Sequence, residues 1–145
     1  MERIDPHTQQ RVWQRVRGEQ PDAIQEQPLI AAEAEIAAQL QTLIRYFPGN
    51  SRMLKAMLTQ TRHHLACLRG MHLLRQGINL PKSTGIHRNS DPTALVRKCY
   101  VNCLNLCARY AALSNDPEYG IVYAEMAATT RHHCAQLLTL LGNGK

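Results

Sequence analysis

The chain has 145 residues, 44% of them hydrophobic, with a single Phe and a single Trp, so we expect one domain with a mainly aliphatic core. It has no apolar run of about 18 residues, which excludes a transmembrane helix, and its polar start lacks the apolar part of a signal peptide, so a cytoplasmic protein is expected. The net charge of +6 comes from scattered Lys and Arg without a basic block, which disfavours nucleic-acid binding.

The spacing of apolar residues predicts helices throughout and no strand. A short helix is predicted first, over residues 9–17, where Val12, Trp13 and Val16 share one face. Four longer helices follow, at about 28–47, 51–77, 91–114 and 119–142. Asp-Pro pairs at 91–92 and 116–117 begin the last two, since Asp caps a helix and Pro suits its first turn.

The connections between the four long helices define the topology. The first two helices, and the last two, are separated by only a few residues, so each pair should form an antiparallel hairpin. Residues 77–90 join the hairpins and, at roughly 3.3 Å per residue, could cross a helix of about 25 residues. We therefore predict an N-terminal arm, residues 1–27, followed by a four-helix bundle, residues 28–145.

The motif Thr-Arg-His-His-x-Ala-x-Leu begins at position 61 and again at position 130, which indicates two copies of one helical unit. At about 100° per residue, the second histidine of each pair, His64 and His133, borders the apolar face of its helix. The histidines expected at the surface are His63, His72, His87 and His132.

A carboxylate and a thiol fall on the apolar faces of the other two helices. Glu33 lies 31 residues before His64, and Cys103 lies 30 residues before His133. A buried carboxylate is costly without a partner, so Glu33 requires a metal, a histidine or a hydrogen-bond donor, unless it reaches solvent at the edge of its face. For both histidines the alternative to a metal is a hydrogen bond at the core edge, to a backbone carbonyl or to Glu33.

The five cysteines include no Cys-x-x-Cys pair, which argues against a zinc ribbon and for reduced thiols. Cys99, Cys103 and Cys107 occupy successive turns of one helix. A row of redox-sensing thiols is one interpretation, and we favour the other, in which they fill the core as small apolar side chains.

Together these features resemble the ferritin-like superfamily, and rubrerythrin-type proteins most closely. The resemblance covers about residues 28–141, including the segment around 64–72 and the turn Asn-Asp-Pro-Glu-Tyr-Gly at 115–120. It implies an all-α, ferritin-like four-helix bundle with two antiparallel hairpins and a long crossover. It also implies a centre of two irons, held by single Glu residues on the first and third helices and by Glu-x-x-His on the second and fourth.

This chain departs from the family's ligand pattern. The resemblance places Glu33, His64 and His133 at ligand positions. The other three positions hold Thr61, Cys103 and Thr130. A register shifted by one residue would substitute Gln60 and Thr129 and would still supply no acid. Because neutral hydroxyls cannot replace bridging carboxylates, we expect no ordinary di-iron centre and no enzyme activity of the family kind.

We therefore interpret the chain as a rubrerythrin-related bundle protein that is non-catalytic or binds a single metal. The candidate metal ligands are Glu33, His64, Cys103 and His133, a set that suits one zinc or iron ion; the competing interpretation is that no metal binds. The alternative functions are a di-metal oxidoreductase or iron-handling protein with an altered site, and a bundle with a polar ligand pocket. Self-association as a dimer is the expected partnership, and no membrane is expected.

Overall fold

The computed structural model of the chain describes residues 21–77 and 91–143, with side chains described for residues 26–77 and 91–142. Within these ranges the protein is all-helical and contains no strand, which confirms the predicted class. The helices are α2 (Pro21–Tyr46), α3 (Ser51–Gln76), α4 (Pro92–Ala112) and α5 (Gly120–Asn143), with a 3₁₀ turn, η1 (Pro48–Asn50), between the first two. The helix predicted at residues 9–17 lies outside the described residues.

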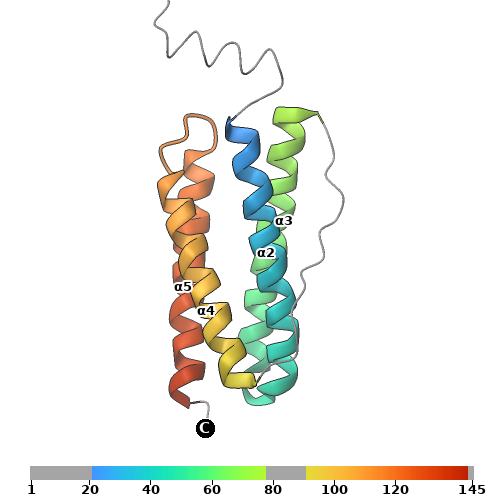
Figure 1. Cartoon of the computed structure of the whole chain (residues 1–145), viewed down its shortest axis with the longest axis vertical. Coiled ribbons are helices and arrows are strands. Elements are labelled where there is room, and N and C mark those ends of the chain that lie inside the picture. Colours follow the sequence, from blue (N-terminus) through green and yellow to red (C-terminus); the bar gives the residue numbers. More distant parts are fainter. Residues whose placement is uncertain (1–20, 78–90, 144–145) are drawn as a thin grey trace, which may run out of the picture.

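The four helices lie side by side as two hairpins (Figure 1). Helices α2 and α3 run in opposite directions and pack along their length, and so do α4 and α5. Helices α3 and α4 run in the same direction, because α3 ends at one end of the bundle and α4 begins at the other. The hairpins meet mainly through α2 and α4 and more sparsely through α3 and α5.

Helix ends follow the capping residues in the sequence. Asp91 precedes α4 and its Oδ2 accepts a hydrogen bond from the Ala94 N–H at 3.1 Å, which satisfies one free donor of the first turn. Gly77 ends α3 with φ of 67°, and its N–H donates to the Leu73 carbonyl at 2.7 Å. A glycine fits this position because it adopts the left-handed conformation without a steric penalty.

Helix α2 begins earlier than the sequence predicts. Its first residue is Pro21, and Pro28, the predicted start, lies inside the helix. Proline favours the first turn of a helix, but here its ring is exposed and the helix continues through it with the loss of one backbone hydrogen bond. The predicted boundary between residues 27 and 28 therefore falls within α2, and Glu26 belongs to its buried face.

The core between the helices is mainly aliphatic and also contains two fully buried tyrosines. The rings of Tyr110 and Tyr123 stack with centroids 6.2 Å apart and an angle of 25° between their planes. Cys99 and Cys103 are buried in the same core, with free thiols. The fully buried aliphatic side chains of the core include Leu29, Ile36, Leu40, Leu43, Leu54, Met57, Leu68, Leu95, Leu106 and Leu137.

The turn between α4 and α5 is closed by two features. A Cβ atom at Gly120 would collide with the backbone carbonyl of Ser114, so only glycine allows this close approach. Asp116 Oδ2 accepts hydrogen bonds from the N–H groups of Tyr119 at 2.7 Å and Glu118 at 3.0 Å. The predicted Asp-Pro signal therefore lies in the turn, and α5 begins just after it.

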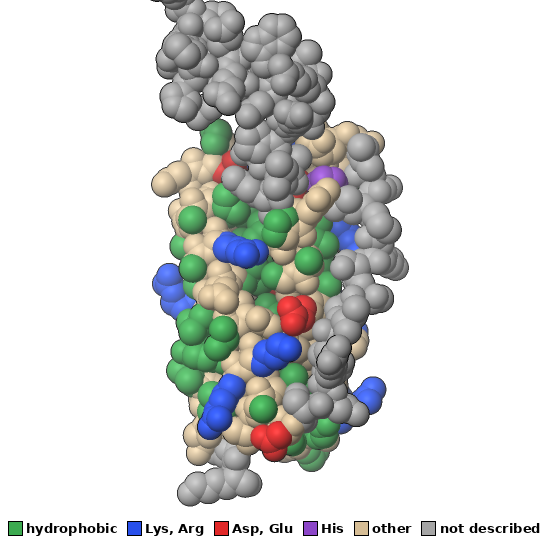
Figure 2. All heavy atoms as spheres, in the orientation of Figure 1, with side chains coloured by type: hydrophobic (Ala, Val, Ile, Leu, Met, Phe, Trp, Pro, Cys, Tyr) green, Lys and Arg blue, Asp and Glu red, His purple; other side chains and the backbone are tan. Residues whose placement is uncertain are grey.

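The visible face of the molecule carries Lys and Arg side chains separated by uncharged atoms, with acidic side chains among them (Figure 2). None of the helices within residues 21–77 and 91–143 combines the length and apolar character that a membrane crossing needs.

Candidate functional site

The interior of the bundle holds a hydrogen-bonded cluster of three polar side chains from three helices. Glu33 on α2 accepts two hydrogen bonds at Oε2, from His64 Nδ1 on α3 at 2.7 Å and from the Tyr110 hydroxyl on α4 at 2.6 Å. Glu33 is 2% exposed, His64 5% and Tyr110 0%. The partner that the sequence requires for Glu33 is therefore a protein side chain, and His64 makes the predicted alternative contact to that carboxylate.

The surroundings of this cluster keep the hydroxyl of Tyr110 protonated, so that it can donate a hydrogen bond. Burial, followed by the charge of Glu33, raises the pKa of Tyr110 above its ordinary range, so its hydroxyl keeps its proton and donates. The ring of His64 packs edge-on against that of Tyr110, with centroids 6.1 Å apart. Both donors reach the same oxygen, so the buried carboxylate of Glu33 is hydrogen-bonded within the protein.

His133, the second predicted imidazole ligand, is buried on α5 and bonds to a different helix. Its Nε2 lies 2.6 Å from Gln60 Oε1 on α3, and since that oxygen can only accept, Nε2 carries the proton. Burial, then the charges of His64 and His132, lower the pKa of His133 to about 4. The imidazole is therefore neutral at pH 7.

Cys103, the predicted ligand from the third long helix, is 1% exposed and lies beside two other thiols. A hydrogen bond with Cys134 lowers its pKa, but a hydrogen bond with Cys99, burial and the nearby charge of Glu33 together raise that pKa well above the usual thiol range. The side chain is thus a neutral thiol within an apolar layer.

The structure brings two of the four predicted metal ligands, Glu33 and His64, into direct contact. Cys103 and His133 lie close enough for these charges to affect their pKa values, yet their hydrogen-bond partners are Cys134 and Gln60. Within the described residues, no group of three or more His, Cys, Asp or Glu side chains is arranged so that it could hold a metal ion.

Thr61 and Thr130, which the resemblance places at two of the ligand positions, are both buried. Thr130 donates to the carbonyl of Met126 at 2.7 Å, one turn earlier on its own helix. Thr61 is 1% exposed and its Oγ1 has no hydrogen-bond partner. Neither threonine forms a hydrogen bond with the carboxylate of Glu33.

A second glutamate–histidine pair lies further along the same hairpin, and the sequence interpretation missed it. His72 was expected at the surface, but it is 3% exposed, and its Nδ1 lies 3.1 Å from Oε2 of fully buried Glu26. Glu26 precedes Glu33 by two helical turns, and His72 follows His64 by about two. This matched spacing on antiparallel helices could have predicted the second pair. It was missed because a helix that starts at Pro28 does not include Glu26.

An arginine extends this second pair to the other hairpin. Arg75 on α3 places Nε 3.4 Å from Glu26 Oε1 and Nη2 3.0 Å from Asp116 Oδ2, and its guanidinium lies 4.8 Å from the centre of the Tyr119 ring. Burial alone would raise the pKa of Asp116. The backbone N–H groups of Tyr119 and Glu118, together with Arg75, outweigh burial and hold that pKa below its ordinary value. These buried charges join α2, α3 and the α4–α5 turn.

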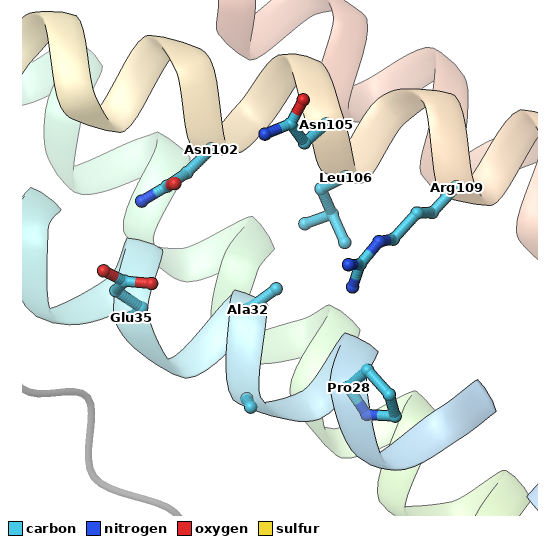
Figure 3. Close-up of a pocket in the computed structure, with 8 residues that line it drawn as sticks. Pro28, Ala32, Glu35, Asn102, Asn105, Leu106 and Arg109 are labelled. Atoms are coloured by element: carbon cyan, nitrogen blue, oxygen red, sulfur yellow. The ribbon is translucent and has the colours of Figure 1, made fainter. Parts of the chain in front are cut away.

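One cavity between the described helices, of about 370 Å³, lies between α2 and α4; Arg109 extends across it toward α2, and Glu35 lies at its other end (Figure 3). A smaller one, of about 120 Å³, lies between α3 and α5. Its lining residues are His63, His64, Cys67, Val122, Glu125, Met126 and Thr129.

His63 and His132 are exposed, as predicted, and His87 lies outside the described residues. Comparison of the chain with models of protein families, with curated proteins and with solved structures finds no match.

Proposed function

We propose that this protein is a rubrerythrin-related, ferritin-like bundle that acts without catalysis, as a helical protein for self-association or protein contact. The observation that carries the proposal is the double hydrogen bond to Glu33 Oε2, from His64 at 2.7 Å and Tyr110 at 2.6 Å. In a rubrerythrin-type protein the corresponding Glu and His face metal ions. Here two side chains of the protein itself donate to the carboxylate, and this supports a role without a bound metal.

The residues at the remaining family positions support the same conclusion. Two irons close together require bridging anions, and the matching positions hold buried Thr61, Thr130 and Cys103, all of which are neutral. Thr130 already donates to its own helix. Glu33 is therefore the one acidic residue of the predicted ligand set, and the residues at these three positions are neutral.

A single divalent ion held by Glu33, His64, Cys103 and His133 is the second candidate. It is supported by the mutual influence of these groups: the charge of Glu33 raises the pKa of Cys103, and that of His64 lowers the pKa of His133. Binding would require His133 to coordinate through Nδ1, since Nε2 donates to Gln60, and Cys103 to lose its proton. The competing proposal, an altered di-metal oxidoreductase or iron-handling protein, would need acids that these positions do not supply.

The test is metal analysis of untagged, reduced protein together with an iron-oxidation assay. We expect no stoichiometric iron, and oxidation of added Fe²⁺ at the rate of buffer alone. Two irons per chain with oxidation above that rate would contradict the proposal. Zinc that is bound by the wild-type protein and lost in both Glu33→Gln and His133→Gln would favour the single-metal candidate.

Self-association and a cytoplasmic location remain proposals tied to the same interpretation. Several large apolar side chains are exposed in the described part of the chain, which suits protein contact. They are Tyr46, Leu73, Leu74, Val101, Leu104, Ile121 and Leu138. Sedimentation of the full chain over a range of concentrations tests dimerisation, and a single monomeric species throughout would contradict it.

A further inference from the structure

The small cavity between α3 and α5 contains a histidine and a cysteine that the interior cluster does not use. His63 Nε2 lies 3.7 Å from Cys67 Sγ, one helical turn further along α3. Both side chains line the cavity, and Glu125 lines it from α5. His63 and Glu125 are exposed and Cys67 is half-buried, so the pair can be reached from solvent.

The separation of these two atoms matches the bite of a tetrahedral zinc ion. Zn–N bonds of about 2.05 Å and Zn–S bonds of about 2.3 Å at a tetrahedral angle place the nitrogen and sulfur about 3.6 Å apart. The observed distance is 3.7 Å, close to this value. Imidazole nitrogen and thiolate sulfur are also the ligand types that zinc prefers.

We propose that His63 and Cys67 form a zinc-binding site on α3, separate from the interior cluster around Glu33. Two protein ligands and water complete the coordination, and the carboxylate of Glu125 offsets the remaining positive charge from across the cavity. Binding is a proton exchange without a redox step: Zn²⁺ and the Cys67 thiol give a zinc–thiolate bond and one released proton, while neutral His63 donates its lone pair.

The duplicated motif provides a matched control within the chain. His132 on α5 occupies the position that His63 has on α3, and it is equally exposed, but the residue four positions later is Gln136. An amide gives no thiolate, so the second copy lacks the soft ligand. A second control is Cys107, also half-buried, whose Sγ instead donates to the Ala127 carbonyl at 3.4 Å.

The test uses the full chain, reduced and without a tag, titrated with Co²⁺ as a spectroscopic probe and then with Zn²⁺ in competition. We expect about one ion per chain, with a thiolate-to-cobalt absorption band that Zn²⁺ abolishes. Cys67→Ser should remove the band, and His63→Gln should weaken binding by about tenfold or more. Glu125→Gln should weaken it by less, since it contributes charge rather than the paired ligands. His132→Gln and Cys107→Ser should bind as the wild type does.

Three outcomes would overturn the proposal. One is the absence of the thiolate band in the wild type. Another is equal weakening by His63→Gln and His132→Gln, which would indicate surface histidines acting alone. The third is a band that survives Cys67→Ser and disappears in Cys103→Ser or Glu33→Gln, which would move the metal to the interior. Circular dichroism of each variant, compared with wild type, separates loss of binding from loss of fold.

Discussion

The neutral state of His133 makes the stability of the bundle depend on pH in a calculable way. Its pKa falls from about 6.5 in the unfolded chain to about 4 in the folded one, so the unfolded chain binds the extra proton over this window. The contribution of a neutral His133 is therefore complete above pH 6.5 and is lost as pH falls toward 4. At about 1.4 kcal/mol per pKa unit the full loss is about 3 kcal/mol, of which about 2 kcal/mol is lost between pH 7 and pH 5.

The substitution that isolates this effect is His133→Gln, whose amide does not titrate. Urea unfolding followed by circular dichroism at pH 7 and pH 5 gives the free energy of unfolding for each protein. Wild type should lose about 2 kcal/mol more than His133→Gln over this interval. The matched variant His132→Gln keeps the titrating imidazole of His133 and removes only a smaller contribution to its depressed pKa, so it should lose nearly as much as wild type. Equal losses in wild type and His133→Gln would refute the assignment of a depressed pKa to this imidazole.

Three further substitutions test the packing and caps. Tyr110→Phe removes a donor from the buried carboxylate of Glu33, and we expect a loss of about 1.5–3 kcal/mol in unfolding free energy by urea titration; an unchanged midpoint would contradict the cluster. Gly120→Ala forces a Cβ against the Ser114 carbonyl and should cost about 1–3 kcal/mol in a thermal melt, whereas a neutral effect would show that the turn can relax. Asp91→Ala removes the cap of α4 and should cost about 0.5–2 kcal/mol in urea, with Asp91→Asn retaining most of the stability.

The helices were predictable because their signals are local. Asp91 with a following proline and Gly77 in the left-handed region act within one turn, so residue type alone locates those ends. The start of α2 was not predictable in this way, because Pro28 indicates a helix start, whereas the helix continues through it. Buried Glu26, two residues before Pro28, contacts His72 of α3, and such a contact can be predicted only when the hairpin register is known.

In the candidate site, too, features within one helix were predictable and contacts between the hairpins were not. The inward placement of Glu33 and His64 follows from helical periodicity, and their contact was one of the alternatives that the sequence left open. The hydrogen bond from the Tyr110 hydroxyl to Glu33 could not be predicted, because Tyr110 belongs to the other hairpin. This contact depends on the position of α4 along α2, which the sequence does not define. The bond between His133 and Gln60 has the same origin: it joins the sparsely packed pair α3 and α5.

The parallel course of α3 and α4 has a mechanical consequence. It sets the closed turn of each hairpin beside the open end of the other, so the helix termini of one hairpin meet a loop of its neighbour (Figure 1). At one such meeting point Arg75, near the last turn of α3, binds Asp116 in the α4–α5 turn at 3.0 Å. Fraying of the last turn of α3 must therefore break an ionic contact with the opposite hairpin, so a segment far away in the sequence stabilises this helix terminus.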